Sequence, residues 1–331
     1  MRIGITVWIG LTAVLAAKTA FAEDTSLALP SITPGFTAIY VAEDRGFWRD
    51  QGLTVKVSQI AGVGTINAVI AGSIDFSGST AGTLIRAAAA GQRMMAIANL
   101  TDRPMDEIVL RKDVAARLNF DAKAPLVERA ALLKGLNIAV DAINTINHGF
   151  LRYVAKKGGL DPDRDITVAP MQSPTMAAAL VSKAIDGMSI SVPWTTAVVV
   201  DGNAVTLASV PNGDFPELRP FGGGLIVTRP TFCTEKHSIC VAMGRGIVAA
   251  NRFIQEHPDE TLAIIKPRFP QLSEVTLATA LQNYRSASPV PPAVTPAVLT
   301  NSQTFEVNGG LTKPENVLKS YDGMFTDEFV R

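Results

Sequence analysis

Two segments of the chain read alike although 111 residues separate their first residues. The first is Asn67–Phe76 (NAVIAGSIDF) and the second is Ala178–Gly187 (AALVSKAIDG). In each, an apolar segment with helical spacing is followed by Ile-Asp, which opens a short apolar run. The pattern therefore predicts a helix that leads into a strand, and predicts it twice.

The same alternation continues on both sides of each copy. The first half predicts strands near 25–30, 53–57, 74–77 and 94–100 and helices near 38–49, 64–71 and 80–90. The second half predicts strands near 136–141, 166–170, 186–190 and 204–208 and helices near 146–158, 175–184 and 194–201. Alternation of this kind favours mostly parallel sheets with right-handed crossovers and helices on both faces.

Two extended segments link these halves. Residues 107–112 leave the first half, and residues 224–228 lead back to it. Further helices are predicted near 239–256, 259–268 and 273–283, and the Pro-rich passage 289–296 is interpreted as a surface loop. We therefore predict an α/β clamshell that closes about two crossings. One lobe is formed by 23–105 and 222–331, including a helical C-terminal tail, and the other by 106–221.

The first residues have the composition of an export signal. Arg2 gives a positive start, Ile3–Ala17 is almost wholly apolar, and Ala20-Phe21-Ala22 is a small-x-small cleavage site. A membrane anchor is the alternative, but the apolar run is short for a bilayer span and Lys18 interrupts it. We predict a signal peptide at 1–22 and a secreted protein.

Charge excludes several classes of partner. The chain has 30 basic and 30 acidic residues, and it stays near neutrality without the signal peptide. No Lys/Arg excess is present for binding nucleic acid or an anionic membrane.

The chain has two cysteines, Cys233 and Cys240. In an oxidising compartment this pair favours a disulfide that closes a small loop just before the helix near Ile239. The alternative is two free, partly buried thiols. A metal role is weakest, because His237 alone does not complete a tetrahedral set.

Several motifs resemble a known family. They are Ala42–Val55 (AEDRGFWRDQGLTV), Ala61–Thr65 (AGVGT), Ala71–Phe76 (AGSIDF) and Leu133–Val140 (LKGLNIAV). With them, nearly the whole chain after the signal peptide resembles the periplasmic substrate-binding proteins of ABC importers. Within these it is most similar to the group that serves alkanesulfonates, taurine, nitrate and thiamine-precursor pyrimidines.

The resemblance implies a fold and a role. The fold is the two-lobed periplasmic-binding-protein clamshell with two crossovers, similar to type II. The role is capture of a small organic solute in the cleft between lobes and its delivery to an ABC permease in the inner membrane, which uses a cytoplasmic ATPase. The resemblance also implies a periplasmic monomer without a cofactor or a metal.

The turns between strands and helices carry the predicted site. In open α/β sheets, ligands bind at the carboxyl ends of strands, where helix N-termini converge and favour an anionic group. Such turns are rich in Gly, Ser, Thr and Asn here, at 31–36, 62–65, 79–83, 144–147 and 172–175. For any one turn, an ordinary helix N-cap is the alternative.

The resemblance implies that the positions of this chain that match the family's cleft contacts also contact the ligand. These are Pro34, Gly35, Phe36, Gly62, Val63, Gly64, Thr65, Ser79, Thr80, Ala81, Asn144, Thr145, Asn147, Ser191 and Trp194.

Aromatic, histidine and glycine residues refine this site. Phe36 and Trp194 lie on opposite lobes and could enclose the apolar part of a ligand, although each alone also suits a core. His148 could donate to a carboxylate or sulfonate, or serve as a surface cap. Glycines 222–224 lie in the return crossing and could supply hinge freedom or a close approach to ligand; they are Gly222, Gly223 and Gly224.

The rim turns contain no Arg or Lys, and Arg103 near the crossing is the nearest candidate. A protein that holds a small anion through two parallel hydrogen bonds needs an arginine for them. An organic acid or a polar aromatic is therefore favoured over nitrate.

Two other functions are weighed. An enzyme related to pyrimidine-precursor synthesis is disfavoured, because the chain has only two cysteines, in the wrong region for that branch's motif, and no nucleophile-elbow, HExxH or phosphate-loop motif. Carboxylate groups such as Asp102 with Asp106 and Glu107 are interpreted as solvated loops and caps, not metal sites. A receptor that presents its ligand to a membrane sensor would use the same closure, so it stays open.

Overall fold

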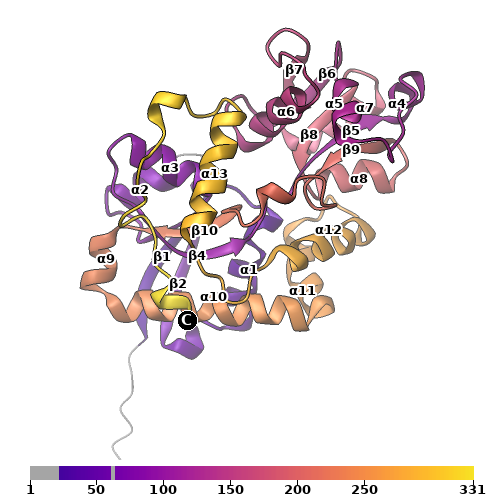
Figure 1. Cartoon of the computed structure of the whole chain (residues 1–331). Helices are drawn as coiled ribbons and strands as arrows, with labels where there is room; N and C mark the ends of the chain where they lie inside the picture. The colour runs from indigo at the N-terminus through magenta and orange to yellow at the C-terminus, as the bar shows by residue number, and fades with distance from the viewer. Residues whose placement is uncertain (1–21, 61–63) are drawn as a thin grey trace, which may run out of the picture.

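The computed structural model describes residues 22–60 and 64–331 and contains two five-stranded sheets flanked by helices (Figure 1). The strand orders are β2-β1-β3-β10-β4 and β7-β6-β8-β5-β9. We call the parts built on these sheets the first and the second lobe. Nearly all of the predicted signal peptide lies outside the described residues, as do Gly62 and Val63.

The first sheet contains one antiparallel strand. Strand β1 is parallel to β2 and β3, whereas β10 runs antiparallel between β3 and β4. The strands are β1 (Glu23–Leu29), β2 (Leu53–Gln59), β3 (Phe76–Ser79), β4 (Met95–Thr101) and β10 (Gly224–Thr228). Their helices are α1 (Thr37–Arg45), α2 (Gly64–Ile70) and α3 (Ala81–Ala89). Helix α1 ends four residues before its predicted end because Gly46 adopts a left-handed conformation, with φ of 74°.

The second sheet repeats this plan. Strand β6 is parallel to β7 and β8, and β5 runs antiparallel between β8 and β9. Its strands are β5 (Asp106–Arg111), β6 (Asn137–Val140), β7 (Thr167–Pro170), β8 (Gly187–Ser191) and β9 (Ala204–Ser209). Its helices are α4 (Lys112–Arg117), α5 (Leu126–Ala131), α6 (Ile146–Lys157), α7 (Ser173–Val181) and α8 (Trp194–Val200).

The two segments predicted as links are strands of the sheets. The outgoing crossing leads into β5 of the second lobe, and the return crossing leads into β10 of the first lobe. Each of these strands runs antiparallel to its neighbour in the sheet. The prediction of mostly parallel sheets with two crossovers is confirmed. Apolar side chains bury each sheet on both faces, with β10 buried along its whole length.

The two crossings lie against each other. The Phe221 amide donates to the Asp102 carbonyl at 2.8 Å, and the Gly223 amide to the Thr101 carbonyl at 3.1 Å. A Cβ on Gly223 would lie 2.5 Å from the Arg103 carbonyl oxygen, and one on Gly222 would lie 2.6 Å from the Ala81 Cβ. Close approach of the chain to itself, not a left-handed φ, therefore explains these glycines.

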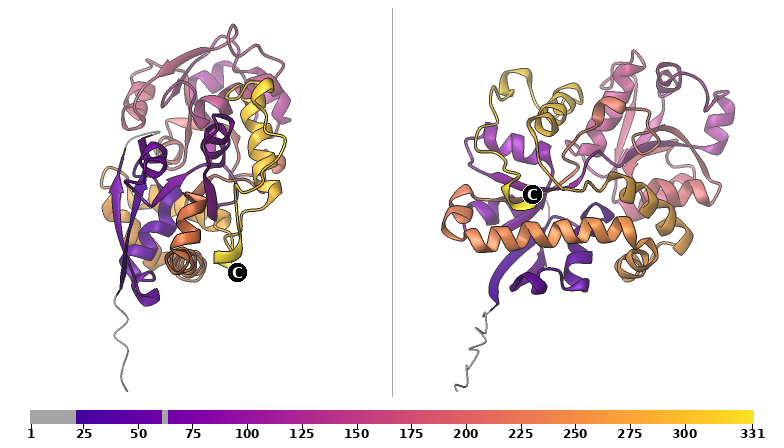
Figure 2. Two further views of the ribbon diagram at one scale, coloured as in Figure 1. Left: turned by 90° about the vertical axis from the view of Figure 1, so that its left-hand side faces the viewer. Right: turned by 60° about the horizontal axis from the view of Figure 1, so that its bottom comes forward.

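The C-terminal tail contacts both lobes. Helix α12 packs against α8, and α13 packs against both α3 and α6. The long helix α10 runs along the first lobe with the C-terminal end beside it (Figure 2). The helices are α9 (Pro230–Glu235), α10 (His237–Glu256), α11 (Pro258–Ile265), α12 (Glu274–Ala287) and α13 (Pro296–Asn308). Short 3-10 turns are η1 (Pro34–Phe36), η2 (Arg49–Gln51), η3 (Pro216–Leu218), η4 (Lys266–Arg268), η5 (Pro314–Asn316) and η6 (Glu328–Val330).

The Pro-rich passage 289–296 is more than the predicted surface loop. Pro292 and Val294 are buried. The Pro292 carbonyl accepts from the Asn99 amide at 2.8 Å, so the passage is bonded to the edge strand β4. Helix α13 begins at its last proline, a position where the missing N–H costs nothing.

The predicted disulfide is present. Cys233 in α9 is bonded to Cys240 in α10, and both residues are buried in the core of the first lobe. The segment between them is largely helical, because α10 begins at His237 and not near Ile239.

Replacing both cysteines, Cys233→Ser with Cys240→Ser, is expected to lower the free energy of unfolding by about 2 kcal/mol, since the closed loop is short. Urea unfolding of the variant and the wild type measures the difference. Wild-type protein unfolded with a reductant should match the variant. Equal midpoints for the variant and the oxidised wild type would contradict this expectation.

Candidate ligand-binding cleft

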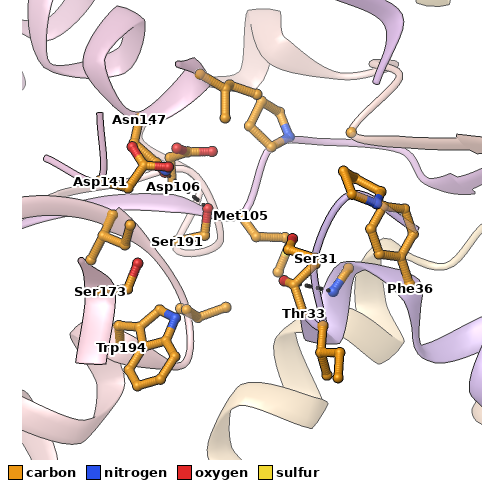
Figure 3. A pocket seen from close by; sticks show the side chains of 18 of the residues that line it. Ser31, Thr33, Phe36, Met105, Asp106, Asp141, Asn147, Ser173, Ser191 and Trp194 are labelled. Carbon is orange, nitrogen blue, oxygen red and sulfur yellow. Dashed lines mark hydrogen bonds between the residues drawn. The ribbon is translucent and has the colours of Figure 1, made fainter. Parts of the chain in front are cut away.

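A cavity of about 670 Å³ lies between the two lobes, near the crossings. The first lobe lines it from the turn after β1 and the start of α3, the second lobe from the turns before α6, α7 and α8 (Figure 3). The crossing and the tail add further residues. Principal lining residues are Ser31, Thr33, Gly35, Phe36, Thr80, Arg103, Met105, Asp106, Asp141, Asn147, Gln172, Ser173, Ser191, Trp194, Gly223, Arg268 and Tyr284.

Several residues predicted from the sequence line this cavity together. They come from both lobes and from the return crossing: Gly35, Phe36, Thr80, Asn147, Ser191, Trp194 and Gly223, with Arg103 beside them. Four of the five predicted turns thus contribute at least one lining residue.

Other predicted residues do not line the cavity. Pro34, Thr65, Ser79 and Ala81 are buried within the first lobe, and Gly64 begins α2 outside the lining. Ala81 is held away from the lining by a backbone hydrogen bond, since its amide donates to the Gly222 carbonyl at 2.9 Å. Gly62 and Val63 lie outside the described residues.

Three predicted residues of the second lobe form a helix cap instead. Thr145 is the N-cap of α6, and its Oγ1 accepts from the His148 amide at 3.3 Å. Asn144 is exposed in a left-handed conformation, with φ of 64°. Its amide donates to Nδ1 of His148 at 3.2 Å. Thr145, Asn144 and His148 are therefore occupied with the start of the helix, as the capping alternative expected.

His148 is not among the residues that line the cavity. It is 7% exposed, and burial, followed by the nearby Arg152 charge, lowers its pKa. A neutral ring that accepts through Nδ1 has no charge to offer an anion. The lining therefore gives no support to a contact between His148 and a carboxylate or sulfonate, which stays a prediction.

Thr80 both lines the cavity and caps a helix. It lines the cavity and also caps α3, where its Oγ1 accepts from the Thr83 amide at 3.3 Å. Its hydroxyl also lies 3.1 Å from that of Thr83. The cap role predicted as the alternative is thus present beside its position in the cleft.

Phe36 and Trp194 lie on opposite sides of the cavity (Figure 3). Phe36 is 5% exposed and belongs to the first lobe's core, so little of its side chain is left for the wall of the cavity. Trp194 is half-buried at the start of α8 and packs on the second lobe's core. Trp194 is therefore the aromatic surface with most area left for a ligand.

Two arginines line the cavity, and both are held by the protein. Nε of Arg103 donates to Asp102 at 3.0 Å, and another of its nitrogens donates to the Ser286 carbonyl at 2.7 Å. Arg268 of the tail, which sequence reasoning missed, forms a two-pronged pair with Asp44 at 2.8 and 3.0 Å. These pairs reduce the positive charge available to a ligand.

The structure also places two carboxyl groups in the lining that the prediction missed. Asp141 follows β6, and Asp106 begins β5 (Figure 3). The interpretation of Asp106 and Glu107 as solvated is wrong, since they are 1% and 6% exposed. Glu107 accepts from the hydroxyl of Ser209 at 2.7 Å and from that of Thr195. Asp102 is also buried, in ion pairs with Arg103 and Arg219.

Strand direction explains the position of Asp106. Because β5 runs antiparallel to β8, its first residue pairs with Ser191, the last residue of β8. The start of β5 therefore lies at the carboxyl edge of the parallel strands, where ligands bind. For Asp141 the signal was available in the sequence, since it is the last residue of the predicted strand 136–141.

Burial changes the chemistry of Asp106. Desolvation, then the charges of Asp141 and Glu107, raise its pKa to about 8. Desolvation likewise raises the pKa of Glu107 against the opposing effect of its hydroxyl donors. Asp106 therefore keeps its proton near neutral pH.

Among the described residues, no helix is both long and apolar enough to cross a membrane.

Comparison with known proteins supports the fold. A protein from Bordetella bronchiseptica RB50 superposes with a TM-score of 0.74 at 19% identity, covering 93% of this chain and 96% of the other. The alkanesulfonate-binding protein SsuA from Xanthomonas axonopodis pv. citri, bound to MOPS, gives 0.67 at 20% identity and covers 89% and 96%. The periplasmic nitrate-binding protein NrtA from Synechocystis PCC 6803 gives 0.67 at 16% identity and covers 93% and 87%.

These similarities show the periplasmic-binding-protein clamshell that the sequence predicts. A search of curated protein sequences found no match to the chain. The family comparison reaches further. The model of the NMT1-like family matches residues 22–266, which is most of the chain. This chain therefore belongs to the NMT1-like family.

Proposed function

We propose that this protein is an extracytoplasmic solute-binding protein that captures a small organic solute in the cleft and delivers it to an ABC permease. The observation that carries the proposal is the 670 Å³ cavity, which both lobes and both crossings line. A solute that contacts both lobes favours the closed form by its difference in affinity between the open and closed states. Closure then builds a surface that a membrane partner can recognise.

The comparisons support this role in general terms. The named structural relatives include alkanesulfonate-binding and nitrate-binding proteins, one of them described as periplasmic. Export through the predicted signal peptide would bring this chain to the same compartment. Presentation of the loaded form to a membrane sensor uses the same closure and remains the second candidate.

The described part of the cleft supports binding over catalysis. Its hydroxyl side chains include Ser173 and Ser191. The Ser191 hydroxyl donates to the Asn147 amide oxygen at 3.1 Å, which is not a base, and the buried His148 stands outside the lining. A nucleophilic hydroxyl needs a base within hydrogen-bond reach. We propose that the protein is not an enzyme.

Trp194→Ala is expected to weaken binding of the solute at least tenfold, because it removes the largest apolar contact on the second lobe. Ser31→Trp on the first lobe should weaken it as much, since Ser31 is exposed in the lining and the indole would fill the cleft. Isothermal titration calorimetry measures both changes, with a solute first identified by native mass spectrometry of the purified protein.

Val200→Ala is the matched control, because Val200 is exposed on the same helix as Trp194 and lies outside the lining. It should keep wild-type affinity. Full affinity in both cleft variants would place the binding site elsewhere.

A further inference from the structure

The C-terminal tail passes from the first lobe to the second and returns. Leu299, in the first half of α13, is buried in a core cluster of the first lobe. Phe305, near the end of the same helix, is buried in the core of the second lobe, and Leu311 packs against that core. Met324 is buried in the first-lobe cluster again. We call residues 305–312 the bridging segment.

Basic side chains of α6 hold the bridging segment on the second lobe. Nζ of Lys156 donates to the Asn308 carbonyl at 2.8 Å, and Nε of Arg152 donates to the Gly309 carbonyl at 3.1 Å. The last carbonyls of a helix lack partners within the helix, and cationic side chains satisfy them well. The end of α13 is therefore bonded to a helix of the second lobe.

Apolar contacts fix the same segment. The ring of Phe305 lies 5.7 Å from that of Tyr153 in α6 and 5.6 Å from that of Phe221 in the return crossing, measured between centroids. A Cβ on Gly149 would lie 2.6 Å from Cδ1 of Leu311, so α6 and the bridging segment approach closely at this glycine. The bridging segment is thus packed as a part of the second lobe.

One residue of the bridging segment is bonded to the first lobe instead. The side chain of Glu306 is 4% exposed and forms an ion pair with Arg86 of α3. The Thr312 hydroxyl donates to the same carboxylate at 3.3 Å. A Cβ on Gly82 of α3 would clash with this carboxylate, so the two helices meet closely here. Because a buried carboxylate is costly without its partner, the pair resists separation.

We propose that the bridging segment is a third connection between the lobes, in which the Arg86–Glu306 pair restrains the angle between them. The middle of α13 is fixed to the return crossing as well, since the Gly222 amide donates to the Ser302 hydroxyl at 3.2 Å. A clamshell on two crossings alone rotates freely about its hinge. The consequence for solute binding rests on the proposed function: a wider range of angles lowers the fraction of protein that is ready to bind.

Electron–electron double resonance between two spin labels measures the distance between the lobes in the empty protein. The labels are attached through Lys56→Cys in the first lobe and Val127→Cys in the second, at exposed positions. The natural cysteines form a buried disulfide and do not take the label. We expect Glu306→Met to broaden the distribution of distances clearly. Arg86 has a side chain that is 39% exposed, so it can turn to water when its partner is removed.

Glu260→Met is the matched control, because Glu260 pairs with Arg45 within the first lobe. It removes the same charge from an ion pair and should leave the distances unchanged. Glu306→Gln keeps the shape of the side chain and should broaden the distribution less than Glu306→Met, which secures the test if the methionine variant fails to fold. An unchanged distribution in the Glu306 variants overturns the inference, and so does equal broadening by Glu260→Met.

Measurement on the empty protein separates this inference from the proposed function. If the solute binds outside the cleft, the proposed function fails while the broadening caused by Glu306→Met remains. If the Glu306 variants keep the wild-type distances while Trp194→Ala weakens solute binding, the inference fails and the proposed function stands. With the solute identified by native mass spectrometry, Glu306→Met should also weaken its binding several-fold in calorimetry.

Discussion

Gly223→Ala is expected to destabilise the protein by about 2–3 kcal/mol, because a methyl group there has no room. The added Cβ would lie 2.5 Å from the Arg103 carbonyl oxygen and 2.6 Å from Oγ1 of Thr101. The first of these is backbone, so relief requires the two crossings to separate. Separation would also break the bond from the Gly223 amide to the Thr101 carbonyl.

Thermal unfolding measures this effect as a fall of roughly 5 °C or more. Gly35→Ala is the matched control, since Gly35 also lines the cleft but its Cβ would meet nothing nearer than 3.9 Å. That variant should melt close to the wild type. Equal melting temperatures for the Gly223 variant and the wild type would show that the crossings are not packed as described.

Asp106→Asn is expected to stabilise the empty protein at pH 8. Burial raises the pKa of Asp106 to about 8 from an ordinary value of 3.8. Asn has the same shape and carries no charge, so the variant avoids the cost of burying a carboxyl. The gain should be on the order of a few kcal/mol.

The direction in which stability changes with pH follows from proton binding by Asp106. Below pH 3.8 the carboxyl is protonated in both folded and unfolded chains, and it adds no pH dependence. Between pH 3.8 and about 8 the unfolded chain releases a proton that the folded protein keeps, so wild-type stability falls as pH rises. The difference between Asp106→Asn and the wild type should therefore grow from pH 4 to 8 and level off above.

Urea unfolding of both proteins at several pH values measures this difference. Glu107 is present in both proteins, so the pH dependence that its own burial causes is common to the two sets of measurements. A difference that stays constant from pH 4 to 8 would mean that Asp106 is ionised in the folded protein throughout that range.

Much of the fold was predictable because its strands and helices have clear periodicity. Strands β1 to β4 and β6 to β9 each coincide with a predicted run to within a few residues. The roles of β5 and β10 were not predictable, since an isolated apolar run does not indicate which sheet it will enter. Helices α4, α5 and α9 were missed, each of them six residues long, and so was the 13-residue α13.

The candidate site was predictable where it follows the rule for parallel strands. Asn147 and Trp194 lie in the cleft because helix starts after parallel strands meet at one edge. Asp106 reaches that edge through an antiparallel strand, and its position depends on the pairing with Ser191. The tail residues Arg268 and Tyr284 join the lining only through tertiary packing.

The tail also gives the lobes a connection that two crossings alone do not provide. The Tyr284 hydroxyl donates to the Val192 carbonyl of the second lobe at 3.0 Å. Met105 of the outgoing crossing packs in the same small cluster as Tyr284 and Val192. Helix α12 therefore limits the direction in which the lobes can move as they close.

A crystal structure of the protein with a bound solute would show directly whether the cleft between the lobes holds it. We predict one solute between the lobes, in contact with the turn at Ser31–Phe36 on one side and with Asp106 and Trp194 on the other. A solute seated on one lobe alone, or outside this cavity, would contradict this prediction.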